Sequence, residues 1–349
     1  MSEAKETKVF AARCRCRNIS YTVEIRTSDL PLAAHICGCG TCRHTHGTFG
    51  AFYVTLPKGV SPLRSNADDV DLTMYDPKSD GHGEMSFCSI CGAHHGYWNG
   101  IMSQWVLDLA LFDKPFWSFK KSLSINSSAD GGMLPWLPEK YGNGEGVLPT
   151  ARTSPRIGQN GEEEKLRAAC HCGSISFTIL RPNQAAQNDP YMRDYISPKD
   201  PRKWKAFLDF CSDCRLLTSA PFVPWMLVPR ILIEPEMPAD IKLFSPVLKT
   251  YESSEGVVRS FCGKCGATVF IKTVNRLPSE EQMILNVGMG ILRASEGARA
   301  ESWVTWRTGK CAFVDDGREF DESLTEAVVD GHQRWGLELY GDAPDFDVI

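Results

Sequence analysis

The chain has 349 residues, of which 42% are hydrophobic and 23% charged, and its formal net charge is −5. This length suggests two domains of roughly 150–200 residues, each with its own core. The balance of 38 Lys and Arg against 43 Asp and Glu gives no electrostatic reason to expect nucleic acid or an anionic membrane as a partner. The first ten residues lack a secretory signal, and no apolar stretch is long enough to span a membrane, which predicts a cytoplasmic protein.

Fourteen cysteines are the unusual feature of the composition, and they fall into two groups. The early group comprises Cys14, Cys16, Cys37, Cys39, Cys42, Cys88 and Cys91. The late group comprises Cys170, Cys172, Cys211, Cys214, Cys262 and Cys265, while Cys311 stands alone without an assigned role. In a reducing compartment, cysteines in tight CxC and CxxC pairs are more often metal ligands or redox thiols than structural disulfides.

The two groups repeat one pattern along the chain. A CxC motif followed by Ile-Ser-aromatic-Thr occupies residues 14–22 and again 170–178, and Ser-Phe-Cys-x-x-Cys-Gly-Ala occupies 86–93 and again 260–267. A period this long indicates duplicated domains, because solenoid repeats are about 20–50 residues long. Between the copies lies a stretch rich in Gly, Pro, Ser and charge, which is typical of a linker. The expected units are a first domain (8–141), a linker (142–166) and a second domain (167–335).

Apolar stretches within each copy are short and rich in β-branched or aromatic residues, with turn residues between them. They are residues 19–25, 49–56, 175–179 and 269–274. This pattern predicts a mainly β fold with few helices. The second copy has 16 additional residues between its first and middle cysteine motifs, within 182–205, where Tyr191, Tyr195 and Trp204 occur. The insertion is either a surface excursion or a lid over a site.

The outer motifs of each copy supply four thiolates, the usual ligand set of a closed structural zinc site. The two sets are Cys14, Cys16, Cys88 and Cys91 in the first copy and Cys170, Cys172, Cys262 and Cys265 in the second. Gly92 and Gly266 follow the two CxxC motifs and permit the tight turn that brings two sulfurs together. The alternative is that these cysteines are free or form disulfides, which the repeated spacing and the lack of a signal peptide disfavour.

The middle motif of the first copy differs from the outer ones. Cys37, Cys39 and Cys42 supply three thiolates, with no fourth cysteine at a fixed distance. Three protein ligands leave an open position on zinc, and a set of soft sulfurs suits a thiolate ligand best. A histidine could instead close the site and make it structural. The candidates for that role are His35, His44 and His46.

The middle motif of the second copy is altered, because Asp209 stands at the position that matches Cys37 and is followed by Cys211 and Cys214. A carboxylate oxygen can ligate zinc, so the three residues could form a mixed oxygen and sulfur site. The other alternative is a weakened or lost site in which the two cysteines are kept as small buried residues. The loss is favoured, since the nearby insertion indicates that this region has been remodelled.

The three ordered motifs resemble the glutathione-dependent formaldehyde-activating family, which also includes centromere protein V and is often called the CENP-V/GFA domain. The matching segments are C-x-C (14–16), C-x-C-x-x-C-R (37–43) and F-C-x-x-C-G (87–92) in the first copy, and C-x-C (170–172), C-x-x-C-R (211–215) and F-C-x-x-C-G (261–266) in the second. The resemblance covers most of both halves. It implies two tandem Mss4-like zinc-binding β domains, with a structural zinc at the outer motifs and a catalytic zinc at the middle motif.

The resemblance further implies a zinc-dependent carbon–sulfur lyase type of activity, because the founding reaction of the family joins glutathione to formaldehyde. Zinc at the middle motif of the first copy would hold a thiol as thiolate near neutral pH. Arg43 could orient a carboxylate or stabilise negative charge, and His44 and His46, with ordinary pKa values of about 6.5, could transfer protons. The alternative for each of these three residues is a solvent-exposed polar side chain without a role.

We therefore expect two Zn²⁺ ions in the first domain and one in the second, with a further one at Asp209, Cys211 and Cys214 as the alternative. The expected partner is a small-molecule thiol or carbonyl substrate, with glutathione as one candidate, and neither nucleic acid nor a membrane. Two other functions stay open, namely a zinc-stabilised binding or scaffold protein without catalysis and a zinc enzyme for a larger carbonyl metabolite. A scaffold for an acidic partner would carry a basic segment, whereas residues 341–349 are acidic.

Overall fold

The structure is a computed structural model of the chain, and it is mainly β, as the sequence predicted. It describes residues 6–64, 71–78, 83–123, 127–137, 140–141, 146–147, 163–273, 279 and 282–348. Most of the expected linker at 142–166 lies outside the described residues. A short pair of strands, β11 (Lys140–Tyr141) and β12 (Gly146–Val147), lies at the start of that region.

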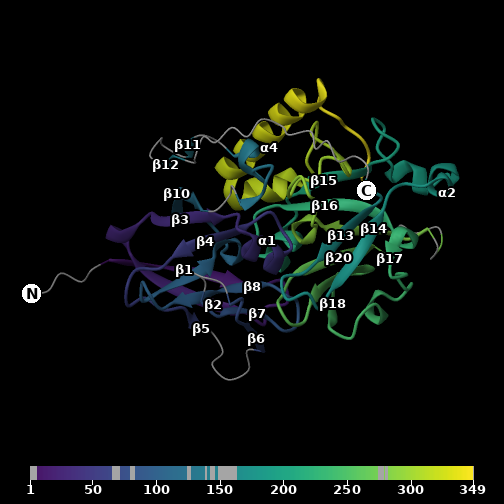
Figure 1. The fold of residues 1–349 in the computed structure, drawn as a ribbon. Helices are drawn as coiled ribbons and strands as arrows, with labels where there is room; N and C mark the ends of the chain where they lie inside the picture. Colours follow the sequence, from purple (N-terminus) through teal and green to yellow (C-terminus); the bar gives the residue numbers. More distant parts are fainter. Residues whose placement is uncertain are drawn as a thin grey trace, which may run out of the picture.

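The first half of the chain forms a three-stranded sheet and a seven-stranded sheet (Figure 1). The small sheet consists, in spatial order, of β1 (Thr7–Arg13), β2 (Ser20–Arg26) and β5 (Leu63–Arg64). The large sheet consists, in spatial order, of β10 (Trp117–Leu123), β3 (Leu32–Cys37), β4 (Ala51–Thr55), β9 (Gln104–Asp108), β8 (His94–Asn99), β7 (Met85–Cys88) and β6 (Leu72–Tyr75). Strand β10 pairs with β3 in parallel, and the other neighbours are antiparallel.

The second half repeats this arrangement strand for strand. Its small sheet consists of β13 (Lys165–Ala169), β14 (Ser176–Leu180) and β17 (Ile233–Glu234). Its large sheet consists, in the matching order, of β22 (Val304–Trp306), β15 (Trp204–Asp209), β16 (Val223–Pro229), β21 (Ile284–Gly288), β20 (Thr268–Thr273), β19 (Val257–Cys262) and β18 (Leu248–Ser254). Here too the terminal pair, β15 and β22, is the parallel one. The chain thus comprises two β domains with the same topology, as the repeated motifs predicted.

Each of the four apolar stretches named from the sequence lies mostly on one strand, namely β2, β4, β14 or β20, and residue 274 of the last stretch lies outside the described residues. Their residues alternate between buried and more exposed in β2 and β14, whereas β4 and β20 are buried over most of their length. The difference follows from position, because β4 and β20 lie inside the seven-stranded sheets and are covered on both faces.

The helices are α1 (Gly40–His46), α2 (Gln184–Asn188), α3 (Ser212–Thr218) and α4 (Val314–Tyr340). The last was not predicted, and the expected end of the second domain at residue 335 lies inside it. The non-helical backbone of Asp321 divides this element, and after it the buried residues Leu324, Val328 and Trp335 follow helical spacing. Among the described residues, no helix combines the length and the apolar character that crossing a membrane requires.

The two copies share one continuous hydrophobic core, and each places its short helix against the other copy. Helix α1 contacts the 3₁₀ turn η9 (Met289–Ile291) of the second copy, and α3 contacts the matching turn η2 (Leu109–Leu111) of the first. The amide of Gly290 donates to the carbonyl of Gly47 at 3.1 Å, just after α1. After α3, the hydroxyl of Ser219 donates to the carbonyl of His94 at 2.8 Å. The contact surface between the copies, here called the seam, therefore contains the same helix-to-turn contact twice, as expected for an approximate two-fold axis.

The insertion of the second copy forms α2 and the 3₁₀ turn η5 (Met192–Tyr195) before β15 begins at Trp204. Trp204 is fully buried, and the rings of Tyr191 and Tyr195 contact each other with centroids 5.3 Å apart. In Figure 1, α2 lies at the right-hand edge of the molecule, far from α1 near the centre. This placement favours the surface excursion over a lid on the first copy's middle motif.

Candidate metal centres

The outer cysteines of each copy converge as the spacing predicted. The four Sγ atoms of Cys14, Cys16, Cys88 and Cys91 all lie within 4.8 Å of one another, and so do those of Cys170, Cys172, Cys262 and Cys265. Sulfurs bound at 2.3 Å around one tetrahedral zinc lie about 3.8 Å apart. The pairs of shortest separation, at 3.4 to 3.6 Å, are near this value and far longer than a disulfide bond. Both sets therefore fit a closed zinc site.

The tight turn at each CxxC motif, here called the knuckle, has a backbone hydrogen bond and a backbone conformation that favour glycine. The amide of Gly92 donates to the carbonyl of Cys88 at 2.9 Å, and Gly92 has φ +84. Gly266 repeats this at φ +76 with the carbonyl of Cys262. A Cβ at Gly92 would lie 2.6 Å from Cγ of Phe261 in the other copy. These two glycines thus serve both the turn around the sulfurs and the close packing of the copies.

The middle cysteines of the first copy gather where β3 passes into α1. Cys37 ends β3, Cys39 caps α1 with its Sγ accepting the amide of Cys42 at 3.3 Å, and the three Sγ atoms lie within 4.8 Å of one another. Cys37 and Cys42 are buried, whereas Cys39 is partly exposed. Tyr53 lines the site with its hydroxyl 3.7 Å from Sγ of Cys42, and Met85 packs beside it. Access to the sulfurs is therefore from the Cys39 side.

No histidine or carboxylate of the described residues joins this group of three thiols. The ring of His46 is turned to other partners. Its Nδ1 lies 3.1 Å from the carbonyl of Cys42, and its Nε2 lies 3.0 Å from Oδ1 of the buried Asp108. The ring also stacks on His94 at 4.0 Å between centroids. His46 is thus a buried, fully engaged side chain and not the exposed residue of the alternative reading.

His44 is held from the second copy. Nη1 of Arg293 donates to its Nδ1 at 2.8 Å, and the amide of His171 donates to its backbone carbonyl at 3.0 Å. Because arginine only donates, Nδ1 of His44 is an acceptor and its proton lies on Nε2. Burial, followed by the charges of Arg293 and Arg43, lowers the pKa of His44 to about 2. The expectation of a pKa of about 6.5 at His44 is therefore wrong, and the imidazole is neutral.

Arg43 is buried beside the same cysteines, with 8% of its surface exposed. Its Nε has no hydrogen-bond partner among the described residues. Burial lowers the pKa of Arg43, and the neighbouring Asp130 and Cys39 oppose that shift. The carboxylate of Asp130 already accepts from the amide of Arg299 at 2.6 Å. Arg43 therefore keeps one buried donor, Nε, without a hydrogen-bond partner among the described residues.

The altered middle motif of the second copy also comes together, but around a side chain that the sequence analysis missed. The ligand atoms of Asp209, Cys211 and Cys214 lie within 4.8 Å of one another. Nη1 of Arg259 lies 3.2 Å from Sγ of Cys214, and its Nη2 lies 3.9 Å from Sγ of Cys211. Sγ of Cys214 donates to Oδ2 of Asp209 at 3.2 Å. Burial lowers the pKa of Arg259, but the two cysteines raise it by more, so this guanidinium stays charged.

The missed residues differ in whether a signal for them existed. Arg259 stands three positions before Cys262, where the first copy has Met85 before Cys88, so aligning the repeats reveals it. Asp108, at the end of β9, and Arg293, two residues after η9, lie outside every cysteine motif, and only the folded chain brings them to α1. Cys311 stays outside the clusters, with its Sγ 3.7 Å from Nδ1 of His332.

A comparison with protein families finds a match in the first copy. Residues 9–124 match the family model described as glutathione-dependent formaldehyde-activating enzyme. The matched range contains the outer and middle cysteines of the first copy, from Cys14 to Cys91. Comparisons with curated proteins and with solved structures find no match.

Proposed function

We propose that this chain, which carries in residues 9–124 a domain of the glutathione-dependent formaldehyde-activating family, is a zinc-dependent enzyme that acts on a carbon–sulfur bond at the first copy's middle site. The observation that supports this most is the convergence of Cys37, Cys39 and Cys42 without a fourth ligand among the described residues. A three-thiol set with one partly exposed member fits an open zinc site. The substrates would be a small thiol and a carbonyl compound, with glutathione as one candidate.

The donor set decides what zinc would contribute. Zinc held by three thiolates would lower the pKa of a substrate thiol and keep it as a nucleophilic thiolate. The protein holds its own sulfurs on rigid elements, because Cys37 lies at the end of a central strand and Cys39 and Cys42 on the first turn of α1. The hydroxyl of Tyr53 is positioned against Cys42, and burial raises its pKa well above the ordinary value, so it stays protonated as a donor.

In the proposed reaction, a bond forms between the substrate sulfur and the carbonyl carbon. The thiol releases its proton, and the carbonyl π pair moves to the oxygen, which takes up a proton. Neither His44 nor His46 is proposed as the proton carrier, because the first is neutral with a pKa of about 2 and the second is fully engaged in the core. We assign them positioning roles, in which they fix α1 against β9 and against the second copy. Solvent at the partly exposed Cys39 side supplies and removes the protons.

Arg43 is proposed to bind a negatively charged group of the thiol substrate. Its buried guanidinium retains an unpartnered Nε, and Arg293 of the second copy stands beside it through the intervening His44. The matching arginine of the second copy, Arg215, instead donates to the backbone carbonyls of Ala110 and Phe112. Nη1 of Arg215 is thus engaged by the backbone of the first copy, although its Nε, like that of Arg43, has no hydrogen-bond partner among the described residues. We propose that Nε of Arg43 donates to the ligand.

The test uses the full chain purified with zinc and without chelators. Exchange between free formaldehyde, glutathione and their adduct would be followed by NMR, with and without the protein. We expect the protein to accelerate exchange and the Cys39→Ser variant to lose that acceleration while it keeps its folding. Cys211→Ser, the counterpart in the second copy, should exchange like the unmodified protein.

The other functions predict different results in the same measurements. A zinc-stabilised binding or scaffold protein would bind zinc at all three thiol sites and accelerate nothing. An enzyme for a larger carbonyl metabolite would leave formaldehyde unaffected but accelerate adduct formation between a thiol and a bulkier aldehyde such as benzaldehyde. Loss of folding in Cys39→Ser would contradict the proposal, because it would make the middle site structural.

A further inference from the structure

The middle motif of the second copy brings together three side chains that could bind zinc, namely Asp209, Cys211 and Cys214. The guanidinium of Arg259 contacts the two sulfurs of this group. Asp209 ends β15, Cys211 caps α3, and Cys214 lies on its first turn, as in the first copy. The difference lies on the neighbouring strand. Met85 of β7 becomes Arg259 of β19, at the same distance from the following CxxC motif.

The contacts of Arg259 consume the same lone pairs that a metal would need. Its Nη1 and Nη2 point to Sγ of Cys214 and Cys211 at 3.2 and 3.9 Å. Sγ of Cys214 donates a hydrogen bond to Oδ2 of Asp209, and Oδ1 of Asp209 accepts a hydrogen bond from the amide of Cys211 at 2.7 Å. Nε of Arg259 is satisfied separately by the hydroxyl of Ser253 at 2.9 Å. The cluster is closed by hydrogen bonds without any ion.

Charge gives the same result as geometry. Asp209 and Arg259 carry opposite charges, so the cluster is neutral when both thiols keep their hydrogens. Zinc at these three ligands would lie within a few ångströms of a guanidinium that cannot lose its proton. At the position that matches Arg259 the first copy has no charge, because the uncharged Met85 is 1% exposed and packs beside the thiols.

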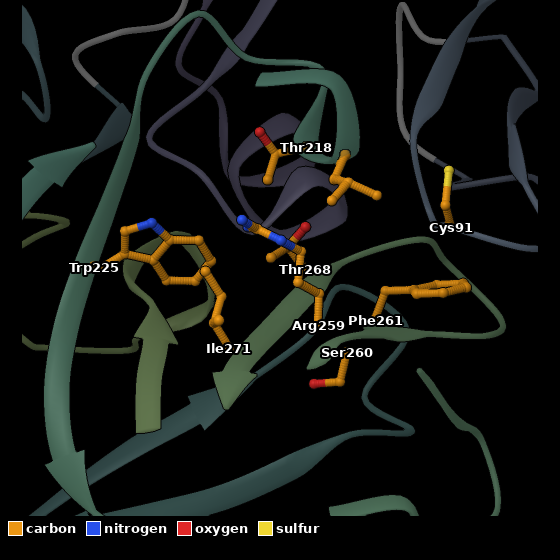
Figure 2. Close-up of a pocket in the computed structure, with 9 residues that line it drawn as sticks. Cys91, Thr218, Trp225, Arg259, Ser260, Phe261, Thr268 and Ile271 are labelled. Carbon is orange, nitrogen blue, oxygen red and sulfur yellow. The ribbon is translucent and has the colours of Figure 1, made fainter. Parts of the chain in front are cut away.

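Space around Arg259 is equally restricted. Figure 2 shows its side chain directed between Trp225 and Phe261, with Thr218 above it. The cavity that these residues line is about 10 Å³, which is room for a single water and for no organic ligand. Asp209, Cys211 and Cys214 do not line this cavity, and its small volume shows that the side chain of Arg259 has little room to move away from the two sulfurs.

We infer that the guanidinium of Arg259 takes the place of the metal ion in the second copy's middle site, so that Asp209, Cys211 and Cys214 form a metal-free cluster with it. The chain then binds three zinc ions in total, two at the outer clusters and one at the first copy's middle site. This inference concerns metal occupancy and does not require that the first copy be an enzyme.

A reciprocal exchange tests it on the full chain. Zinc per chain would be measured by elemental analysis after growth in zinc and gel filtration without chelators, and cobalt would replace zinc for spectra of the thiolate-to-cobalt bands. We expect three ions in the unmodified protein and two in Met85→Arg, which alters no ligand. Arg259→Met combined with Asp209→Cys should bind four. Arg259→Lys, which keeps the charge, should bind three.

Each variant has its own control for folding. Circular dichroism and retention of the two chelator-resistant ions at the outer clusters would show that a variant keeps both β domains. The inference is overturned if the unmodified protein binds four ions and Cys211→Ser lowers the count to three. It is equally overturned if folded Met85→Arg retains three, or if the folded double variant stays at three, because an arginine at this position would then not decide occupancy.

Discussion

The two middle sites share one frame and differ in what occupies it. In both copies the end of a strand and the first turn of a short helix present the candidate ligand atoms, and a strand that leads into a CxxC motif passes beside them. The first copy surrounds its thiols with Tyr53 and Met85, whereas the second surrounds them with a carboxylate and a guanidinium. The two copies therefore share their strand order and outer cysteine clusters but differ in the residues around the middle site.

The same difference extends to the helix that follows. His44 and His46 of α1 correspond to Leu216 and Thr218 of α3, and Asp108 corresponds to Gly288. The polar pair of His46 and Asp108 thus exists only in the first copy. The second copy instead contributes Arg293, which donates a hydrogen bond to His44 of the first copy.

The largest expected effect is the loss of folding stability when an outer cysteine cluster, which both copies have, is disrupted. Cys88→Ser and Cys262→Ser each remove one of four sulfurs from a closed site. A structural zinc contributes about 10 kcal/mol or more of apparent binding free energy, so each variant should lose most of its folding stability. The measurement is chemical denaturation with zinc present.

The control for the outer clusters is Cys211→Ser, in a site where we expect no metal. It should change the free energy of unfolding by only about 1–3 kcal/mol, the range for a disturbed buried hydrogen bond. An equally large loss in this variant would contradict the distinction between outer and middle sites.

The next effect probes the contact between the copies at the knuckles. Gly92→Ala introduces a side chain at φ +84 and directs its Cβ at Phe261 of the other copy. Strain of about 1–2 kcal/mol and overpacking of about 1–3 kcal/mol should together lower the free energy of unfolding. Gly173→Ala is the matched control, because Gly173 has φ +74 but nothing within 4 Å of a Cβ. Equal losses in the two variants would show that packing across the seam contributes nothing.

A third effect tests whether Arg43 binds the negative charge of a thiol ligand. Binding of 3-mercaptopropionate and of the neutral 3-mercapto-1-propanol to cobalt-loaded protein would be followed by the thiolate-to-cobalt band. Loss of one charge-assisted hydrogen bond of about 1.5–3 kcal/mol in Arg43→Gln should weaken the carboxylate ligand at least about tenfold. The neutral thiol should be affected much less.

The control for charge in general is Arg167→Gln, which removes an exposed positive charge near Arg293. It should leave both dissociation constants within about twofold, because exposed charges are screened by solvent. Equal weakening of both thiols in Arg43→Gln would mean that Arg43 acts on the metal site and not on the carboxylate. If neither thiol changes the spectrum, the open coordination position itself is contradicted.

The smallest effect concerns α4, which belongs to neither repeated frame but touches both copies. His332 lies between Trp136 of the first copy and Trp306 of the second, and burial lowers its pKa to about 3. The unfolded chain, with a pKa of about 6.5, takes up this proton first, so the stability due to neutral His332 is complete above pH 6.5 and is lost as the pH falls toward 3.

His332→Phe removes that titration and keeps a ring. Below pH 6, the free energy of unfolding of the unmodified protein should fall more steeply than that of the variant, by up to about 1.4 kcal/mol per pH unit. Protonation of the zinc thiolates affects both proteins alike and cancels in the difference. Parallel pH profiles would show that His332 is not kept neutral by the fold.

Several features of this protein were predictable because they depend on short spacings. Two sulfurs three residues apart beside a glycine fit a tight turn around a metal, which made the outer clusters predictable, and the repeat of that spacing made the duplication predictable. The mainly β class followed from the short β-branched and aromatic stretches, whereas the order of the strands did not. The change from Cys37 to Asp209 was visible in the same way. Helix α4 carried a helical spacing of apolar residues but no cysteine motif, and it was missed for that reason.

What the sequence by itself determined is which sulfurs belong together and which copy has lost one. Only the tertiary structure decided what surrounds them, because strands β7 and β19 return beside the middle motifs after about forty residues and deliver Met85 to one and Arg259 to the other. Only the packing of one copy against the other brought Arg293 to His44, and only the folding of the first copy brought Asp108 and His94 to His46. Burial sets the charge of such groups, and burial depends on contacts between residues distant in sequence, which no local pattern contains.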